Sequence, residues 1–133
     1  MVTVVAALIQ SDGKILVCQR KRGTRFGMLW EFPGGKVKTG ETHQDALARE
    51  LNEELGTLAT VGPELYRTSY RYAELSDSLE LIFFRATLDP KKVRNLDFEQ
   101  IEWRVLSSLA KLKFLPADKE LIEMLATGRL HIA

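Results

Sequence analysis

Hydrophobic and polar positions along the chain follow a two-residue period in some segments and a helical period in others. Alternating or continuous runs of apolar and β-branched residues are typical of strands. The strand-like segments cover residues 2–9, 15–20, 65–74, 78–88 and 101–106. Turn signals separate them at Asp12-Gly13 and near Ser76-Asp77. The pattern therefore predicts two strand pairs and one further short strand.

Helical spacing dominates residues 42–55 and returns near the end of the chain. In the first of these segments one arc is apolar and consists of Leu47, Ala48, Leu51 and Leu55. Thr42 is a good N-cap, with Asp45 three residues later. A closing helix is expected from Pro116 to about Ala126, because Gly128 is a stop signal.

Two stretches lack a clear period. Residues 21–36 are rich in glycine and arginine and are typical of a functional loop, and residues 107–114 are expected to be irregular or a short helix. The order of strands, helix, strands and helix predicts an α/β (α+β) fold with a mixed sheet between helices. At 133 residues, we expect a single domain over 1–133.

Composition narrows the choice of function. The chain is 45% hydrophobic and 28% charged, and its formal net charge of +1 gives no bulk attraction to nucleic acid or an anionic membrane. Its apolar start has no basic segment before it, and no apolar run approaches the length of a membrane span. Cys18 has no partner for an internal disulfide. We therefore expect a cytoplasmic protein with neither membrane nor nucleic acid polymer as partner.

Three glutamates crowd one arc of the first helix. Glu50, Glu53 and Glu54 are neighbours on the helix surface, where like charges repel, and no lysine lies between them. A solvated acidic face is one interpretation. The other is a divalent cation, because magnesium prefers carboxylate and phosphate oxygens. Upstream, Gly34-Gly35 permits a close backbone approach to a ligand, which favours the second interpretation.

The spacing of these residues resembles the Nudix box, G-x5-E-x7-R-E-U-x-E-E-x-G-U, where U is a bulky aliphatic residue. All fixed positions match, and Thr57 replaces the last aliphatic residue. The matching residues are Gly35, Glu41, Arg49, Glu50, Leu51, Glu53, Glu54 and Gly56. The segments "WEFPGGK" and "FLPADKEL" extend the resemblance to the MutT-type branch over the whole chain.

The resemblance implies a fold, a reaction and a cofactor. The fold is an α/β/α sandwich around a mixed sheet. The reaction is hydrolysis of nucleoside triphosphates, oxidised ones such as 8-oxo-dGTP included, to a monophosphate and pyrophosphate, which cleans the nucleotide pool and protects DNA. Mg²⁺ or Mn²⁺ neutralises the phosphate oxygens in such a reaction. We expect a monomer or a weak homodimer.

The resemblance also assigns roles around the cation. Glu50, Glu53 and Glu54 match the family's metal ligands, with the Gly34 carbonyl beside them, and either Glu50 or Glu53 acts as the base. Arg49 and Glu41 are expected to support the loop and the ligands by salt bridging. A further acidic ligand is expected ahead of Trp103, where spacing favours Asp97 over Glu99, although an exposed loop acid is the alternative.

The remaining candidates would contact the substrate. Basic groups for the phosphates are Arg20, Lys36 and Arg25, and plausible pocket walls are Val4, Tyr72 and Leu79, with strand core as the alternative. Phe26 and Trp30 either stack or pack. Asp118 takes the place of the base-reading asparagine in the family, and its ionised form only accepts hydrogen bonds. Its alternative role is to cap the closing helix.

Asp118 leaves the base undecided, because an acceptor suits the amine of cytosine or guanine, and a protonated carboxyl also donates. A CTP/dCTP-type pyrophosphohydrolase is therefore the alternative to the oxidised-nucleotide enzyme. ADP-ribose or dinucleoside polyphosphate hydrolysis is more remote. A non-catalytic Nudix-like binding module is also conceivable, but such modules usually lack box carboxylates that this chain retains.

Overall fold

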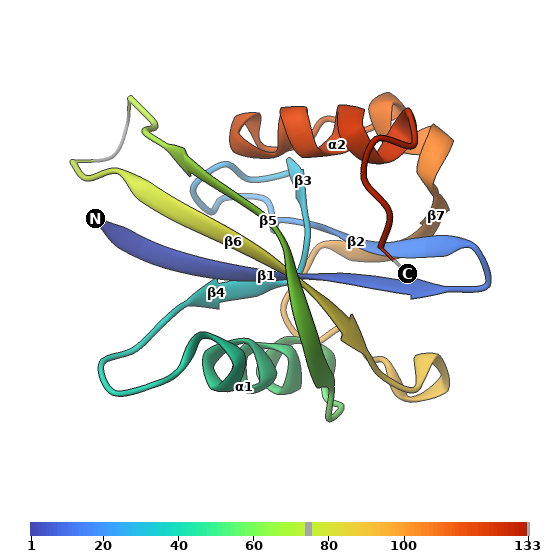
Figure 1. Cartoon of the computed structure of the whole chain (residues 1–133), viewed down its shortest axis with the longest axis horizontal. Coiled ribbons are helices and arrows are strands. Elements are labelled where there is room, and N and C mark those ends of the chain that lie inside the picture. Colours follow the sequence, from blue (N-terminus) through green and yellow to red (C-terminus); the bar gives the residue numbers. More distant parts are fainter. Residues whose placement is uncertain (74–75, 133) are drawn as a thin grey trace.

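A seven-stranded mixed sheet forms the centre of the computed structural model, which describes residues 1–73 and 76–132 (Figure 1). The strands are β1 (Val2–Ser11), β2 (Lys14–Gln19), β3 (Trp30–Glu31), β4 (Gly34–Lys36), β5 (Thr60–Tyr70), β6 (Leu79–Thr87) and β7 (Gln100–Val105). β1 pairs antiparallel with β2 and β4 but parallel with β6. β5 pairs with β6, and both β3 and β7 pair with β2. The expected mixed sheet is confirmed.

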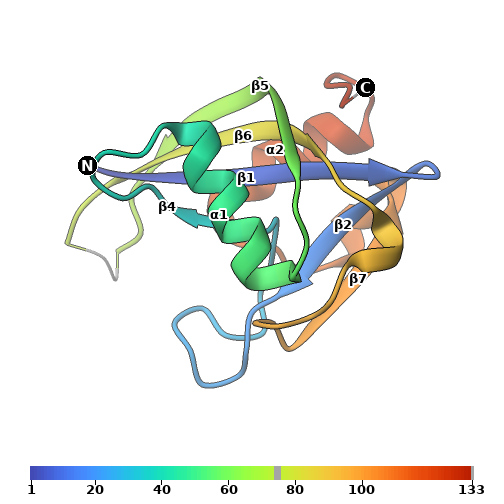
Figure 2. The same ribbon diagram turned by 90° about the horizontal axis from the view of Figure 1, so that it is seen from below.

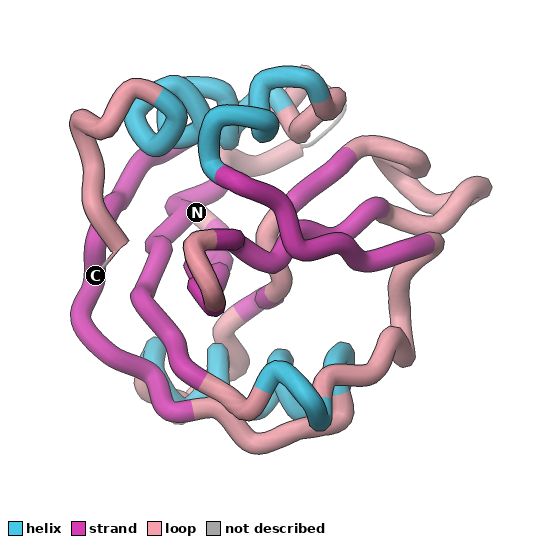
Figure 3. Tube along the Cα trace, turned by 90° about the vertical axis from the view of Figure 1, so that its right-hand side faces the viewer, coloured by secondary structure: helices cyan, strands magenta, loops and turns pink. Residues whose placement is uncertain are grey.

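Helices cover both faces of this sheet. The two α-helices are α1 (His43–Leu55) and α2 (Lys119–Ala126). In Figure 1 they lie on opposite sides of the strands, and Figures 2 and 3 show the same layering from two other directions. Short 3-10 helices cover Pro90–Lys92, Leu106–Lys111 and Pro116–Asp118. The layers therefore run helix, sheet, helix, as the fold class predicts. None of the described helices is long and apolar enough to cross a membrane.

The alternating residues of β1 separate two hydrophobic cores. Val5 and Ala7 pack on the α1 side, whereas Ala6 and Leu8 pack on the α2 side. This alternation follows from the two-residue period of a strand, and it explains why β1 is apolar on both faces. β1 is thus a buried central strand that holds its paired strands β2, β4 and β6 in place.

Local signals set the bounds of α1. The Thr42 hydroxyl accepts a hydrogen bond from the Asp45 amide at 3.0 Å, as predicted. Gly56 ends the helix in the left-handed region (φ 68°), where its amide reaches the Asn52 carbonyl. The buried face consists of Ala46, Leu47, Leu51, Glu54 and Leu55. Ala46 therefore completes the apolar face in place of Ala48, which is only half-buried.

Three predicted segments differ from the structure. The strand expected over 65–74 is β5 at Thr60–Tyr70, because register shifts between Val61 and Tyr66 let the strand begin earlier; residue 74 lies outside the described residues. The loop over 21–36 contains β3 and β4, which are too short to show a period. The closing helix begins with a 3-10 turn at Pro116–Asp118. Residues 106–111 form a 3-10 helix, which agrees with the short helix expected within 107–114.

Candidate active site

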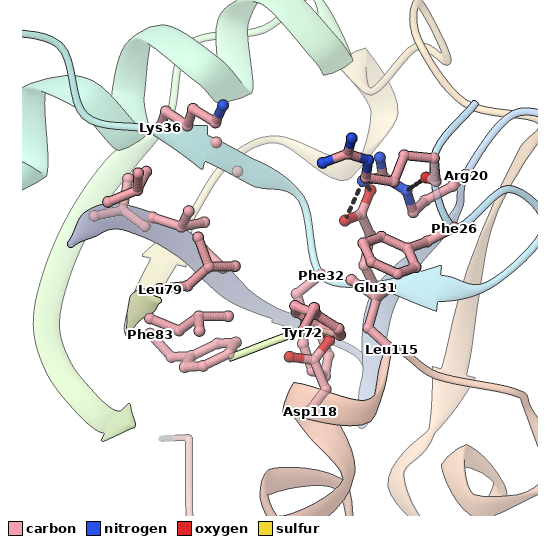
Figure 4. Close-up of a pocket in the computed structure, with 18 of the residues that line it drawn as sticks. Arg20, Phe26, Glu31, Phe32, Lys36, Tyr72, Leu79, Phe83, Leu115 and Asp118 are labelled. Carbon is pink, nitrogen blue, oxygen red and sulfur yellow. Dashed lines mark hydrogen bonds and ion pairs between the residues drawn. The ribbon is translucent and has the colours of Figure 1, made fainter. Parts of the chain in front are cut away.

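A cavity of about 650 Å³ opens between the start of β1, the glycine strand β4 and the beginning of α2 (Figure 4). The predicted site residues that line it are Val4, Arg20, Arg25, Phe26, Gly34, Gly35, Lys36, Glu54, Tyr72, Leu79, Asp97 and Asp118. Glu41, Arg49, Glu50 and Glu53 do not line it, but they belong to the helix and loop that carry Glu54 and Gly34. The cavity also contains Glu31, which sequence reasoning missed although it belongs to the "WEFPGGK" segment.

The two glycines of β4 let the loop press against both β1 and α1. A side chain at Gly34 would overlap the Val5 carbonyl, and one at Gly35 would overlap the Glu50 carboxylate. The Gly34 amide donates a hydrogen bond to Glu54 Oε1 at 3.0 Å. The close backbone approach expected of the glycine pair is therefore present on both sides of β4, against β1 and against α1.

Glu54 is a buried acid among other acids. Its side chain belongs to the buried face of α1, and burial, followed by the charges of Glu31 and Glu50, raises its pKa to about 9. Asp97 acts in the same direction, whereas the hydrogen bond from Gly34 lowers the pKa. An acid in this setting stays protonated near neutral pH unless a cation compensates its charge.

Arg49 forms ion pairs with Glu41 and with two glutamates of α1, Glu50 and Glu53. Its Nε and Nη2 atoms bind the two Glu41 oxygens at 2.7 and 2.9 Å, and its Nη1 binds Glu50 at 2.9 Å. Nη2 also donates to the Lys36 carbonyl at 3.1 Å, while Glu53 is more distant at 3.5 Å. The hydrogen bonds from Arg49 and then from the Lys38 amide lower the pKa of Glu41 to about 2. The salt bridging expected of Arg49 and Glu41 is therefore present, and Arg49 offsets part of the repulsion among the glutamates.

The oxygen donors fit a hard divalent cation. Within residues 1–73 and 76–132, no three His, Cys, Asp or Glu side chains already gather as a metal site. Glu50 and Glu53 instead accept hydrogen bonds from Arg49. Glu54, however, is buried beside further carboxylates, and hard oxygen ligands in this arrangement suit Mg²⁺ or Mn²⁺.

Asp118 lines the same cavity and occupies the N-cap position of α2. Its side chain makes no capping hydrogen bond, so the capping alternative is wrong. The residue is 2% exposed, and burial, with a smaller contribution from Glu31, raises its pKa to about 8. A protonated Asp118 is both a donor and an acceptor. The adjacent Ala117 amide donates to the Tyr72 hydroxyl at 3.2 Å.

The structure also distinguishes the roles of Phe26 and Trp30, and it shows which of Asp97 and Glu99 lines the cavity. Phe26 lines the cavity and its ring centroid lies 4.7 Å from that of Tyr72. Trp30 is buried in the α2-side core and does not line the cavity, so it packs. Asp97 lines the cavity, whereas Glu99 accepts a hydrogen bond from the Arg22 amide outside it.

Comparison with known proteins identifies the family. A family model described as NUDIX domain matches residues 1–126. The chain belongs to the Nudix hydrolase family. A putative 8-oxo-dGTP diphosphatase 2 of Mycobacterium tuberculosis is 36% identical over 130 residues, covering 92% of this chain and 86% of that protein.

Two further similarities support the MutT-type assignment and leave the substrate open. A CTP pyrophosphohydrolase of Escherichia coli is 56% identical over 62 residues, which span 47% of this chain and only 46% of that protein. The solution structure of MutT from Staphylococcus aureus has a TM-score of 0.75 at 35% identity and covers 96% of each chain. The Nudix α/β/α fold expected from the sequence is thereby confirmed.

Proposed function

We propose that this Nudix hydrolase cleaves nucleoside triphosphates, oxidised ones such as 8-oxo-dGTP included, to a nucleoside monophosphate and pyrophosphate with Mg²⁺. One observation carries the proposal: a single cavity joins the Gly34–Glu54 corner of the Nudix box to Asp118. A cavity with carboxylates at one end and an adaptable donor and acceptor at the other suits a molecule with a metal-bound phosphate chain and a base. Nucleotide-pool cleaning in the cytoplasm is the role that fits this reaction.

The residues around Gly34 would hold the cation. Glu54, Glu50 and the Gly34 carbonyl would supply the oxygen ligands, and Asp97 would add a fourth from the loop before β7. When bound, Mg²⁺ neutralises charge on the phosphate oxygens and lowers the pKa of the attacking water. Arg49 orients this set through Glu41, Glu50 and the Lys36 carbonyl.

Glu53 is the better candidate for the general base. Arg49 binds Glu50 at 2.9 Å, but it lies 3.5 Å from Glu53, whose side chain is 55% exposed. A carboxylate that is not committed to a short ion pair is free to accept the proton of the attacking water. Lys36 and Arg25, which line the cavity, would neutralise the phosphates.

The test is Mg²⁺-dependent pyrophosphate release from a panel of canonical and oxidised nucleotides. Glu53→Gln should lower kcat by about 10²- to 10⁴-fold because the base is lost. Glu102→Gln is a matched control, since that carboxylate pairs with Arg104 on β7 and does not line the cavity. Unchanged release by the Glu53 variant would remove it from catalysis. Wild-type protein that releases no pyrophosphate from any nucleotide would favour a binding module.

CTP or dCTP is the second candidate substrate, because of Asp118 and the similarity to the Escherichia coli CTP pyrophosphohydrolase. Asp118→Leu removes both the donor and the acceptor. It should change the ratio of kcat/KM between bases and leave the Mg²⁺ requirement intact, whereas Asp118→Asn, which keeps a donor and an acceptor, should retain the wild-type ratio near neutral pH. Identical base ratios in the Leu variant and the wild type would exclude Asp118 from base recognition.

A further inference from the structure

The hairpin loop between β2 and β3 holds two large residues in an uncommon backbone conformation. Phe26 and Met28 both have positive φ, 58° and 70°. Side chains of this size rarely adopt the left-handed region, and they keep it only where surrounding contacts impose it. The Met28 amide and carbonyl are both bonded, to the Arg20 carbonyl and the Gln19 side chain. The loop is therefore tightly built on β2.

The Arg20 side chain supplies a contact beside the strained residue. Its Nε donates to the Arg25 carbonyl at 2.9 Å, and that carbonyl belongs to the peptide bond that precedes Phe26. Its Nη1 binds both oxygens of Glu31 on β3, at 3.1 and 3.3 Å. Arg20 thus links β3 to the backbone at Phe26. Figure 4 shows this ion pair beside the Phe26 ring.

Phe26 in turn contacts Tyr72, which lies beside Asp118 in the cavity. Its ring meets Tyr72 at a centroid distance of 4.7 Å and an angle of 42°. The Tyr72 hydroxyl accepts a hydrogen bond from the Ala117 amide, one residue before Asp118. A chain of contacts therefore runs from Glu31 through Arg20 and Phe26 to the residue assigned to the base.

We infer that Arg20 and Glu31 form a clasp that positions Phe26 as a wall of the base subsite, and that the clasp thereby sets base selectivity. The substrate in this inference rests on the proposed function, whereas the clasp rests on the contacts alone. Both clasp residues are positioning residues, since they act through Phe26. This replaces the direct phosphate or base contact that we expected of Arg20.

The charge balance favours a positioning role. The Arg20 guanidinium already faces a carboxylate that is only 19% exposed, while its own side chain is 30% exposed. A phosphate at Arg20 would have to compete with this pair, and it would also meet the negative charge of Glu31. Lys36 lines the opposite side of the cavity, without a partner of this kind among the described ion pairs (Figure 4).

Amide hydrogen exchange tests the clasp without any substrate. Arg20→Ala and Glu31→Gln should each speed exchange at the Gly27 and Met28 amides about tenfold or more, because the first loses the hydrogen bond to the Arg25 carbonyl and the second loses the charge that holds the guanidinium in place. Arg22→Ala is the matched control, since it removes the same charge from the same loop outside the cavity. Exchange rates equal to those of the control would overturn the clasp.

Selectivity is tested by a double-mutant cycle. Arg20→Ala and Phe26→Leu should each change the ratio of kcat/KM between two bases, by up to about tenfold, and the double variant should change it no further. Phe26→Tyr, which keeps the ring, should restore the wild-type ratio. Additive effects, or an equal loss for every nucleotide, would assign Arg20 to the phosphates and refute the inference. Absence of hydrolysis by wild-type protein would refute the proposed function instead. The amide hydrogen exchange experiment would then still test whether Arg20 and Glu31 hold the loop.

Discussion

Mg²⁺ binding should release a proton from Glu54. The carboxyl has a pKa of about 9, raised first by burial and then by Glu31 and Glu50. At about pH 7.5 it is protonated, and ionising it costs about 2 kcal/mol, since each pH unit corresponds to about 1.4 kcal/mol. A cation that binds the ionised form must supply this energy. Apparent Mg²⁺ affinity should therefore rise up to about tenfold per pH unit below about pH 9.

Calorimetry in buffers of different ionisation enthalpy measures both the Mg²⁺ affinity and the number of protons released on binding. Wild-type protein should release nearly one proton per Mg²⁺ at about pH 7.5. Glu54→Gln should release none and bind Mg²⁺ weakly at every pH, although its amide oxygen still accepts from Gly34. Glu102→Gln serves as the control. A wild-type affinity that is independent of pH, with no proton released, would refute the reasoning about Glu54.

The same pKa predicts how stability depends on pH without the cation. The folded-state pKa of Glu54 lies above the ordinary glutamate pKa of 4.5. Stabilisation by the protonated carboxyl is therefore complete below about pH 4.5 and is lost as the pH rises toward 9. The slope is at most about 1.4 kcal/mol per pH unit. Melting temperatures of the wild type should fall over this range more steeply than those of Glu54→Gln.

Three further substitutions test the surroundings of this carboxyl. Arg49→Ala should lower activity or Mg²⁺ affinity by about 10- to 100-fold, because Glu41 and Glu50 lose their partner; full activity would argue against a supporting role. Gly35→Ala should raise the Mg²⁺ concentration needed for half-maximal rate, because a Cβ there overlaps the Glu50 carboxylate; an unchanged Mg²⁺ dependence would contradict this. Leu51→Ala should cost about 2–5 kcal/mol in urea unfolding while kcat survives below the melting temperature.

Strong local signals made parts of the fold predictable. The Thr42 cap, the leucine arc and Gly56 determine α1 almost by themselves, because caps and a helical period act within a few residues. β3 and β4 were missed because their two and three residues are held by pairing with β2 and β1, which no local period reveals. β5 was displaced for a similar reason, since its register depends on bulges against β6.

The candidate site divides in the same way. Residue types at fixed spacing pointed to a metal and a phosphate chain, because the glutamates and glycines of the Nudix box are close in sequence. Tertiary packing decided the rest. It placed Glu31 in the cavity and buried Asp118 without a capping hydrogen bond from its side chain.

The sequence by itself thus determined the family, the layered fold and the carboxylates available for a cation, because each rests on neighbouring residues. Only the tertiary structure decided the protonation of Glu54 and Asp118 and the partner of Arg20. Those properties depend on burial and on charges brought together from distant segments, such as Glu31 beside Arg20 and near Glu54. The physical reason is that desolvation and charge interactions are properties of a packed environment.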